Sequence, residues 1–108
     1  MNGLSIHLSE GSPTVLHVGG ELDMASADEF STAYEEAVSA GATVVVDMAE
    51  LVFVDAAGLR AILRAAESRN GAGPLTLINA PRVAWLLGVV GVEASSIDFV
   101  TDGDGLVG

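Results

Sequence analysis

The sequence predicts an α/β fold: a single small domain, residues 1–108, with a mixed, mostly parallel sheet. Polar and apolar residues alternate near the N-terminus, which is typical of half-buried strands. Three later segments have the apolar spacing of amphipathic helices, and a short apolar run of strand length follows each one. Helices and strands in alternation favour parallel pairing, because parallel strands need a crossover connection. With half of its 108 residues hydrophobic, the chain can fill the core of one domain.

Two strands are expected before the first helix. Apolar and polar residues alternate over residues 4–8, which predicts a strand at a sheet edge, and the alternation returns over residues 14–18. The turn residues 10–13 favour a hairpin, which would place His7 beside His17. Two histidines without cysteine or an evident third ligand make a weak metal motif. Ordinary strand-face histidines are therefore the better interpretation.

The first helix is expected to begin after Ser26. The segment SADE, residues 26–29, matches a capping box in which the Ser26 hydroxyl caps the helix and Glu29 reaches back. Gly41 is expected to end the helix, and an interior strand follows over residues 43–48. The crossover from the preceding strand should be right-handed. The expected buried stripe of this helix is Phe30, Ala33, Tyr34, Ala37 and Val38.

The second helix is expected to begin after Asp55 and to run to Arg69. A turn-like pair and an apolar cluster, residues 49–54, precede it. Asp55 is predicted to be the N-cap, because its carboxylate can accept from the N–H of Ala57 or Gly58 and faces the positive end of the helix dipole. The stripe Leu59, Ile62, Leu63 and Ala66 is expected to face inward, with Arg60, Arg64 and Glu67 on the other side.

A third helix and two strands complete the expected order of strand, strand, and three helix-strand units. The strands are predicted over residues 75–78 and 97–100. Pro81 suits the first position of the helix between them, and Gly91 suits its end. The expected inward face of this helix is Val83, Leu86, Leu87 and Val90.

Three features near the C-terminal half have weaker signals. Residues 70–71, Asn-Gly, are expected to form the exit from the second helix. Trp85, the only tryptophan, is either a packing residue or a partly exposed contact, and the sequence leaves both open. Residues 102–105 superficially resemble a calcium loop, but the chain ends before a bidentate glutamate. A flexible acidic tail is therefore expected over residues 102–108, after a folded part that ends at residue 101.

The composition excludes several classes of function. Four basic residues stand against fifteen acidic ones, which gives a net charge of −11 and argues against nucleic acid as a partner. The absence of cysteine excludes disulfides, thiolate catalysis and cysteine-ligated metal. No signal peptide is evident, and no apolar run reaches the roughly 18 residues of a membrane span. We expect a soluble, cytoplasmic protein without membrane insertion.

The segment from residue 44 to residue 63, VVVDMAELVFVDAAGLRAIL, resembles the signature of the STAS domain family, the anti-sigma-factor antagonists. In that family a strand ending in Asp leads through an apolar segment to D-S-S/T-G-L at a helix start. Residues 20–23, GELD, also resemble the family, and the resemblance covers nearly the whole chain. It implies a small domain of STAS type in a bacterial stress response. The expected function is to bind an anti-sigma factor, a kinase-like protein, and so to release a sigma factor for transcription.

The resemblance also implies where the anti-sigma factor binds. The expected surface is the first turn of the second helix, together with the loop that carries Asp23. Small side chains would let a partner backbone approach closely, but Gly and Ala also let a helix start pack under a neighbouring loop. The residues alone leave both interpretations open. The expected partner-binding residues are Asp23, Asp55, Ala56, Ala57, Gly58 and Leu59.

One departure from the family pattern bears on regulation. The residue after the second Asp is usually the serine or threonine that an anti-sigma kinase phosphorylates, and here it is Ala56. Ala57 also has no hydroxyl, so the neighbouring position cannot be phosphorylated either. The sequence therefore predicts an antagonist that is not switched by phosphorylation there and is limited by its abundance or by some other event.

Two alternative functions compete with this one. A STAS subunit of a stress-signalling scaffold, a transporter complex or a nucleotide-sensing assembly stays within the family, although the chain has no Walker P-loop and no lysine. A receiver domain with Asp47 or Asp55 as phosphoacceptor lacks the acidic pair and the late lysine that receivers need. No Ser-His-acid order or nucleophile elbow is evident, so we expect no enzyme, no cofactor and no metal. The oligomeric state is left open.

Asp47 closes the predicted interior strand. Its carboxylate is expected to accept backbone N–H groups and to fix the loop that follows, which is a structural role.

Overall fold

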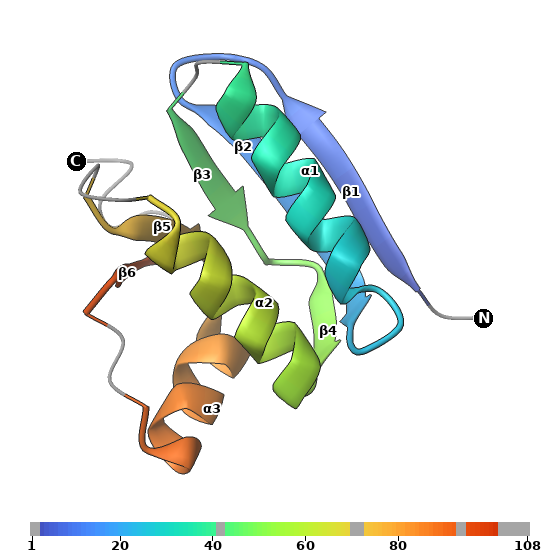
Figure 1. Cartoon of the computed structure of the whole chain (residues 1–108), viewed down its shortest axis with the longest axis vertical. Coiled ribbons are helices and arrows are strands. Elements are labelled where there is room, and N and C mark those ends of the chain that lie inside the picture. Colours follow the sequence, from blue (N-terminus) through green and yellow to red (C-terminus); the bar gives the residue numbers. More distant parts are fainter. Residues whose placement is uncertain (1–2, 41–42, 70–72, 93–94, 102–108) are drawn as a thin grey trace.

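The computed structural model describes residues 3–40, 43–69, 73–92 and 95–101, which form six strands and three helices (Figure 1). The expected residues Gly41, Asn70 and Gly71 and the expected tail over residues 102–108 lie outside this part of the chain. The elements are β1 (Leu4–Ser9), β2 (Thr14–Leu22), α1 (Ala27–Ser39), β3 (Val44–Asp47), β4 (Leu51–Val54), α2 (Ala56–Glu67), β5 (Leu75–Ile78), α3 (Pro81–Val90) and β6 (Ile97–Val100).

The strands form one mixed sheet in the order β1-β2-β3-β5-β6, with β4 paired to β2 beyond the end of β3. β1 is antiparallel to β2, as the predicted hairpin requires, and His7 lies opposite His17 in the register. The other pairs are parallel. The prediction of a mixed, mostly parallel sheet is confirmed.

β4 is a strand that the sequence analysis treated only as an apolar cluster. The nine-residue β2 pairs with β3 along its first half and with β4 along its second half. Between β3 and β4 the chain turns, and Leu51 N–H donates to the Met48 carbonyl over 3.1 Å. Four apolar residues form a strand only when a partner edge is present, and β2 supplies that edge from about thirty residues earlier in the chain.

The hydrophobic core lies between the sheet and the two helices α1 and α2, which lie side by side over one face of it (Figure 1). Phe30 of α1 and Ile62 of α2 have no exposed surface. α3 contacts β4 and adds Val83 and Leu87 to the core. The largest fully buried side chains are Phe30, Leu16, Leu22, Ile62, Leu75, Leu77, Val18, Val46 and Val83.

The predicted capping box at the start of α1 is wrong. Ser26 occupies the N-cap position, but its side chain makes no capping hydrogen bond. The buried Ser26 hydroxyl instead donates to the Glu21 carbonyl over 2.8 Å and accepts from Asp23 N–H at 3.0 Å. The loop between β2 and α1 therefore uses this hydroxyl to satisfy its own backbone.

Some helix details differ from the expectation. α2 ends at Glu67, two residues before the predicted end at Arg69. Val38 and Val90, both expected to face inward, are 41% and 52% exposed. Val38 lies at the edge of the apolar stripe of α1, and Val90 is the last residue of α3, beside an open cavity.

Other local predictions for α3 are confirmed. Pro81 is its first residue, and Gly91 ends it in the left-handed conformation, with φ of 74°. Trp85 is 69% exposed, so it is a surface residue and not a packing residue.

Replacing Phe30 with alanine tests the core. Because Phe30 is fully buried among both helices and the sheet, Phe30→Ala should lower the free energy of unfolding by about 3–5 kcal/mol. Urea denaturation measures the change. Val38→Ala on the same helix is the control and should change stability by no more than about 0.5 kcal/mol. Equal effects of the two substitutions would contradict the assigned orientation of α1.

Candidate functional site

The Asp23 loop and the start of α2 meet at one edge of the sheet. β2 and β4 are parallel, and their last residues, Leu22 and Val54, are register partners. Asp23 begins the loop after β2, and Asp55 joins β4 to α2, so both residues lie at the carboxyl edge of the sheet. A hydrogen bond from Asp55 N–H to the Leu22 carbonyl, 3.3 Å long, ties the two chain segments together. The structure thus brings together the two parts of the predicted partner-binding surface.

Asp55 is the N-cap of α2, as predicted. Its backbone is extended, and its Oδ1 accepts from Gly58 N–H at 2.9 Å. This contact satisfies one of the N–H groups that a helix start leaves without partners, and it holds a negative charge at the positive end of the helix dipole.

The first turn of α2 divides into an exposed and a buried part. Ala56 is exposed and Ala57 is partly exposed, whereas Gly58 and Leu59 are buried. A Cβ on Gly58 would lie 2.2 Å from the carbonyl oxygen of Leu22, closer than any side chain can approach a backbone atom. Gly58 is therefore small because the backbone of Leu22 packs against it, which is one of the two explanations that the sequence left open. The side chains that reach the surface in this turn are those of Ala56 and Ala57.

Asp23 organises its own loop. Its Oδ1 accepts from the N–H groups of Ala25 and Ser26, at 3.0 and 3.2 Å, and lies 3.2 Å from the Ser26 hydroxyl oxygen. The neighbouring Met24 is 81% exposed. Met24 is a surface residue that the sequence analysis missed, although a large apolar residue between loop residues was a visible signal.

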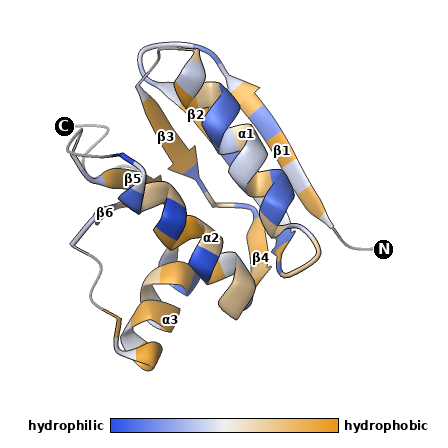
Figure 2. Ribbon diagram, viewed as in Figure 1, coloured by the Kyte–Doolittle hydropathy of each residue, from blue (hydrophilic) through white to orange (hydrophobic). Residues whose placement is uncertain are grey.

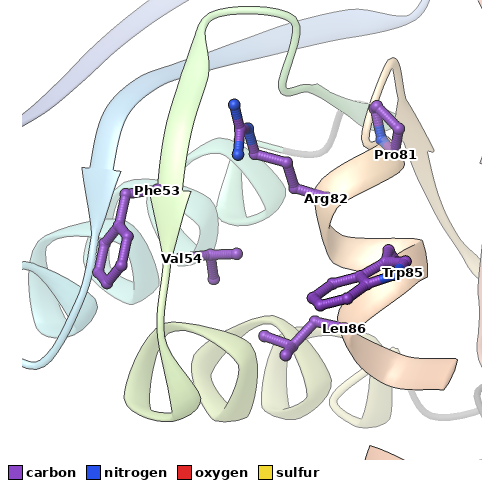
Figure 3. Close-up of a pocket in the computed structure, with 6 residues that line it drawn as sticks. All are labelled: Phe53, Val54, Pro81, Arg82, Trp85 and Leu86. Atoms are coloured by element: carbon purple, nitrogen blue, oxygen red, sulfur yellow. The ribbon is translucent and has the colours of Figure 1, made fainter. Parts of the chain in front are cut away.

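A second feature that the sequence analysis missed is an apolar groove between β4 and α3, which we call the α3 groove. Figure 3 shows Trp85 and Leu86 extending from α3 toward Val54 on β4. One part of the groove, of about 360 Å³, is lined by Phe53, Val54, Pro81, Arg82, Trp85 and Leu86.

The α3 groove continues to the start of α2. A second cavity of about 450 Å³ shares Phe53, Val54 and Leu86 with the first and reaches Asp55 and Ala56. In Figure 2, α3 is apolar along most of its length, whereas hydrophilic residues interrupt α1 and α2. The exposed helix start therefore opens onto an apolar surface.

A series of polar side-chain contacts crosses the neighbouring strands β1, β2 and β3. His17 Nδ1 lies 3.2 Å from Asp47 Oδ2, and His17 Nε2 lies 3.1 Å from the Ser9 hydroxyl. Asp47 Oδ1 also accepts from Ala49 N–H at 3.0 Å, so the predicted backbone contact is confirmed. The His7 and His17 ring centroids are 5.7 Å apart, which confirms the expected neighbours.

The strand register brings Ser9, His17 and Asp47 together although they are distant in sequence, and the sequence analysis did not anticipate these contacts. The position of Ser9 does not favour catalysis by these three side chains. The adjacent cavity, of about 260 Å³, is lined by His7, His17 and Asp47 but not by Ser9, so the three side chains do not converge on that cavity. Among the residues that the structure describes, no group of three or more acidic, histidine or cysteine side chains is suited to hold a metal ion.

Comparison with known families identifies the chain. The family profile described as "Mlab, STAS domain" matches residues 8–101. The chain belongs to the STAS domain family. In the described part of this STAS domain, no helix combines the length and apolar character needed to cross a membrane. A comparison with curated proteins found no match.

Solved structures with the same fold include an anti-sigma factor antagonist from Mycobacterium paratuberculosis. It is 19% identical, with a TM-score of 0.76, over 97% of this STAS domain and 92% of that chain. The unphosphorylated form of the anti-sigma factor antagonist SpoIIAA is 21% identical, with a TM-score of 0.64, over 96% and 93%. The phosphorylated form of the Bacillus cell fate determinant SpoIIAA is 18% identical, with a TM-score of 0.63, over 97% of both chains. At these identities the likeness establishes the fold.

The contact between Gly58 and Leu22 can be tested by adding one methyl group. Gly58→Ala should lower the free energy of unfolding of the STAS domain by about 1–3 kcal/mol, because the Cβ would clash with a backbone carbonyl. Gly88→Ala in α3 is the matched control: no atom lies near its Cβ position, so the change should raise stability by about 0.4–1 kcal/mol. Urea denaturation compares the two, and a stable Gly58→Ala would disprove the close approach.

The two contacts of Asp47 can be separated by a pair of variants. Asp47→Ala removes the acceptor for Ala49 N–H and the partner of His17, so it should lower the free energy of unfolding by about 0.5–1.5 kcal/mol. Asp47→Asn keeps an oxygen that can accept from Ala49 N–H, so it should lower the free energy of unfolding by less than Asp47→Ala does. Thermal denaturation of both variants checks the order, and the reverse order would contradict the assigned backbone contact.

Proposed function

We propose that this STAS domain is an anti-sigma-factor antagonist, which binds an anti-sigma factor and thereby releases a sigma factor. The observation that carries the proposal is the exposed Ala56 at the capped start of α2, beside the Asp23 loop. This is the position that the family resemblance assigns to the regulated contact. The fold likeness to two anti-sigma factor antagonists supports the proposal. The protein acts by binding and not as an enzyme.

The helix start is chemically suited to dock a protein backbone. The first hydrogen bond of the α2 ladder runs from Leu59 N–H to the Asp55 carbonyl, over 2.8 Å. The N–H groups of Ala56 and Ala57 precede it and lie outside the ladder. Their methyl side chains leave room for a carbonyl or carboxylate of the partner to approach these donors.

The absence of a hydroxyl makes the antagonist constitutive. A phosphate at this position adds roughly −1.5 to −2 charge at neutral pH to a surface that binding must bury. It would also stand beside the Asp55 carboxylate. Ala56 and Ala57 cannot accept a phosphate, so the amount of antagonist, or another event, sets how much anti-sigma factor is bound.

A second candidate function is that of a permanent STAS subunit in a stress-signalling, transporter or nucleotide-sensing assembly. The exposed Phe53 and Trp85 favour it, because a permanent partner would cover apolar side chains of this size. The partners that copurify with the protein distinguish the two functions: an anti-sigma factor supports the first, and a stoichiometric complex without one supports the second.

A charge at residue 56 tests the proposed interface. The anti-sigma factor is first identified by affinity purification from cells that carry the protein, and its release of sigma factor is then measured by competition. Ala56→Glu imitates a fixed negative charge and should weaken binding of the anti-sigma factor by about tenfold or more. The helix should remain folded, because a carboxylate is favourable in the first turn.

Ala56→Ser is the matched control and should bind as the original protein does. Incubation with the anti-sigma factor and ATP should leave the original protein without phosphate. Stoichiometric phosphate incorporation would overturn the constitutive mechanism, and full binding by Ala56→Glu would overturn the proposed interface.

A further inference from the structure

We propose that the α3 groove is a docking site for an amphipathic helix of a partner protein, one that carries acidic side chains beside its apolar face. The proposal does not depend on the partner being an anti-sigma factor. It rests on three properties of the described residues: an exposed apolar surface, two adjoining cavities, and arginines without internal partners.

The exposed apolar side chains at the groove lie next to one another and are not scattered singly over the surface. Trp85 and Val90 of α3 are 69% and 52% exposed, and Phe53 of β4 is 47% exposed. Trp85 and Phe53 line the same cavity. Contiguous exposed apolar side chains of this size mark interaction surfaces, and tryptophan is enriched at the centre of such surfaces.

The shape of the groove favours a helix as the occupant. Its two cavities adjoin because they share Phe53, Val54 and Leu86. With volumes of about 360 and 450 Å³, each can hold a large apolar side chain. Residues three or four positions apart on a helix present neighbouring side chains from one face, and this is how an amphipathic helix fills adjoining pockets.

The charges at the rim specify the polar face of that helix. Arg82 lines the first cavity and Arg60 lines the second, and both are exposed. No ion pair or hydrogen bond joins either guanidinium to another residue within the described part of the chain. The chain has only four basic residues against fifteen acidic ones, yet these two remain available beside the groove. Carboxylates of a partner are the groups that match them, in bidentate geometry.

The same charges argue against a second copy of the chain as the occupant. Asp55 is the only carboxylate among the residues that line the two cavities, and it already caps α2. A symmetric contact of groove on groove would therefore bring arginines of both copies together without enough carboxylates to pair them.

The only tryptophan of the chain lies in the groove and reports on its occupation. The probe is a synthetic amphipathic peptide helix with leucine on its apolar face and glutamate beside it. Binding should shift Trp85 emission to shorter wavelength in a saturable way, because the indole leaves water. A matched peptide with lysine in place of glutamate should bind at least about tenfold more weakly.

Two charge variants locate the contact. Arg82→Glu should weaken binding of the glutamate peptide by about tenfold. Arg64→Glu makes the same charge change on α2 at an exposed residue that lines neither cavity, and it should leave the affinity within about twofold. Trp85→Ala should also abolish binding, as measured by calorimetry, whereas Val38→Ala on the exposed side of α1 should not.

Several outcomes would overturn the proposal: no saturable emission shift with the glutamate peptide, equal binding of the lysine peptide, or equal losses for Arg82→Glu and Arg64→Glu. A shift of Trp85 emission that appears when the protein is concentrated without peptide would show self-association through the groove, and this result would also overturn the proposal. The assay contains no anti-sigma factor, so its result is independent of the proposed function.

Discussion

The pairing of β4 with the second half of β2 fixes the position of the candidate site. Because these strands are parallel and in register at Leu22 and Val54, the chain enters α2 directly beside the loop that leaves β2. The Leu22 carbonyl then meets both Asp55 N–H and the α-carbon of Gly58. No larger residue fits at 58, so α2 begins close against β2. The exposure of Ala56 follows from this arrangement.

The residues at the start of α2 are therefore small for two different structural reasons. Gly58 is small because backbone approaches it from inside the domain, whereas Ala56 faces outward. A similar division applies to the acids of the site. Asp55 and Asp23 both use a carboxylate oxygen to satisfy backbone N–H groups, so each holds the local backbone in shape, at the start of α2 and in the loop after β2. The proposed surface for a partner would then consist of backbone, the methyl groups of Ala56 and Ala57, and the exposed Met24.

Charge and apolar surface are unevenly distributed over the domain. The chain is strongly acidic, but Arg60 and Arg82 lie beside the exposed apolar side chains of β4 and α3. The α3 groove and the helix start share the second cavity and form one continuous surface. A partner that occupies both would combine a backbone contact at the helix terminus with apolar anchors in the groove. On the strands β1 to β3, the contacts of His17 with Ser9 and Asp47 link three neighbouring strands and so support the sheet.

The sequence by itself determined the elements whose signals are local. The hairpin, the Asp55 cap, Pro81 at the start of α3 and Gly91 at its end depend on residues within a few positions of one another, and all are found. The family resemblance added the fold and the location of the candidate site. Even the wrong capping box was a local pattern, and it failed because Ser26 found a partner in Glu21, outside the pattern.

The tertiary structure alone decided what depends on residues distant in sequence. β4 became a strand because β2 offered an edge, and His17 paired with Asp47 because two strands came into register. The α3 groove exists because α3 packs beside β4, a contact between elements that helix periodicity does not encode. Periodicity gives the apolar face of a helix, but only packing determines whether another element of the same chain covers it.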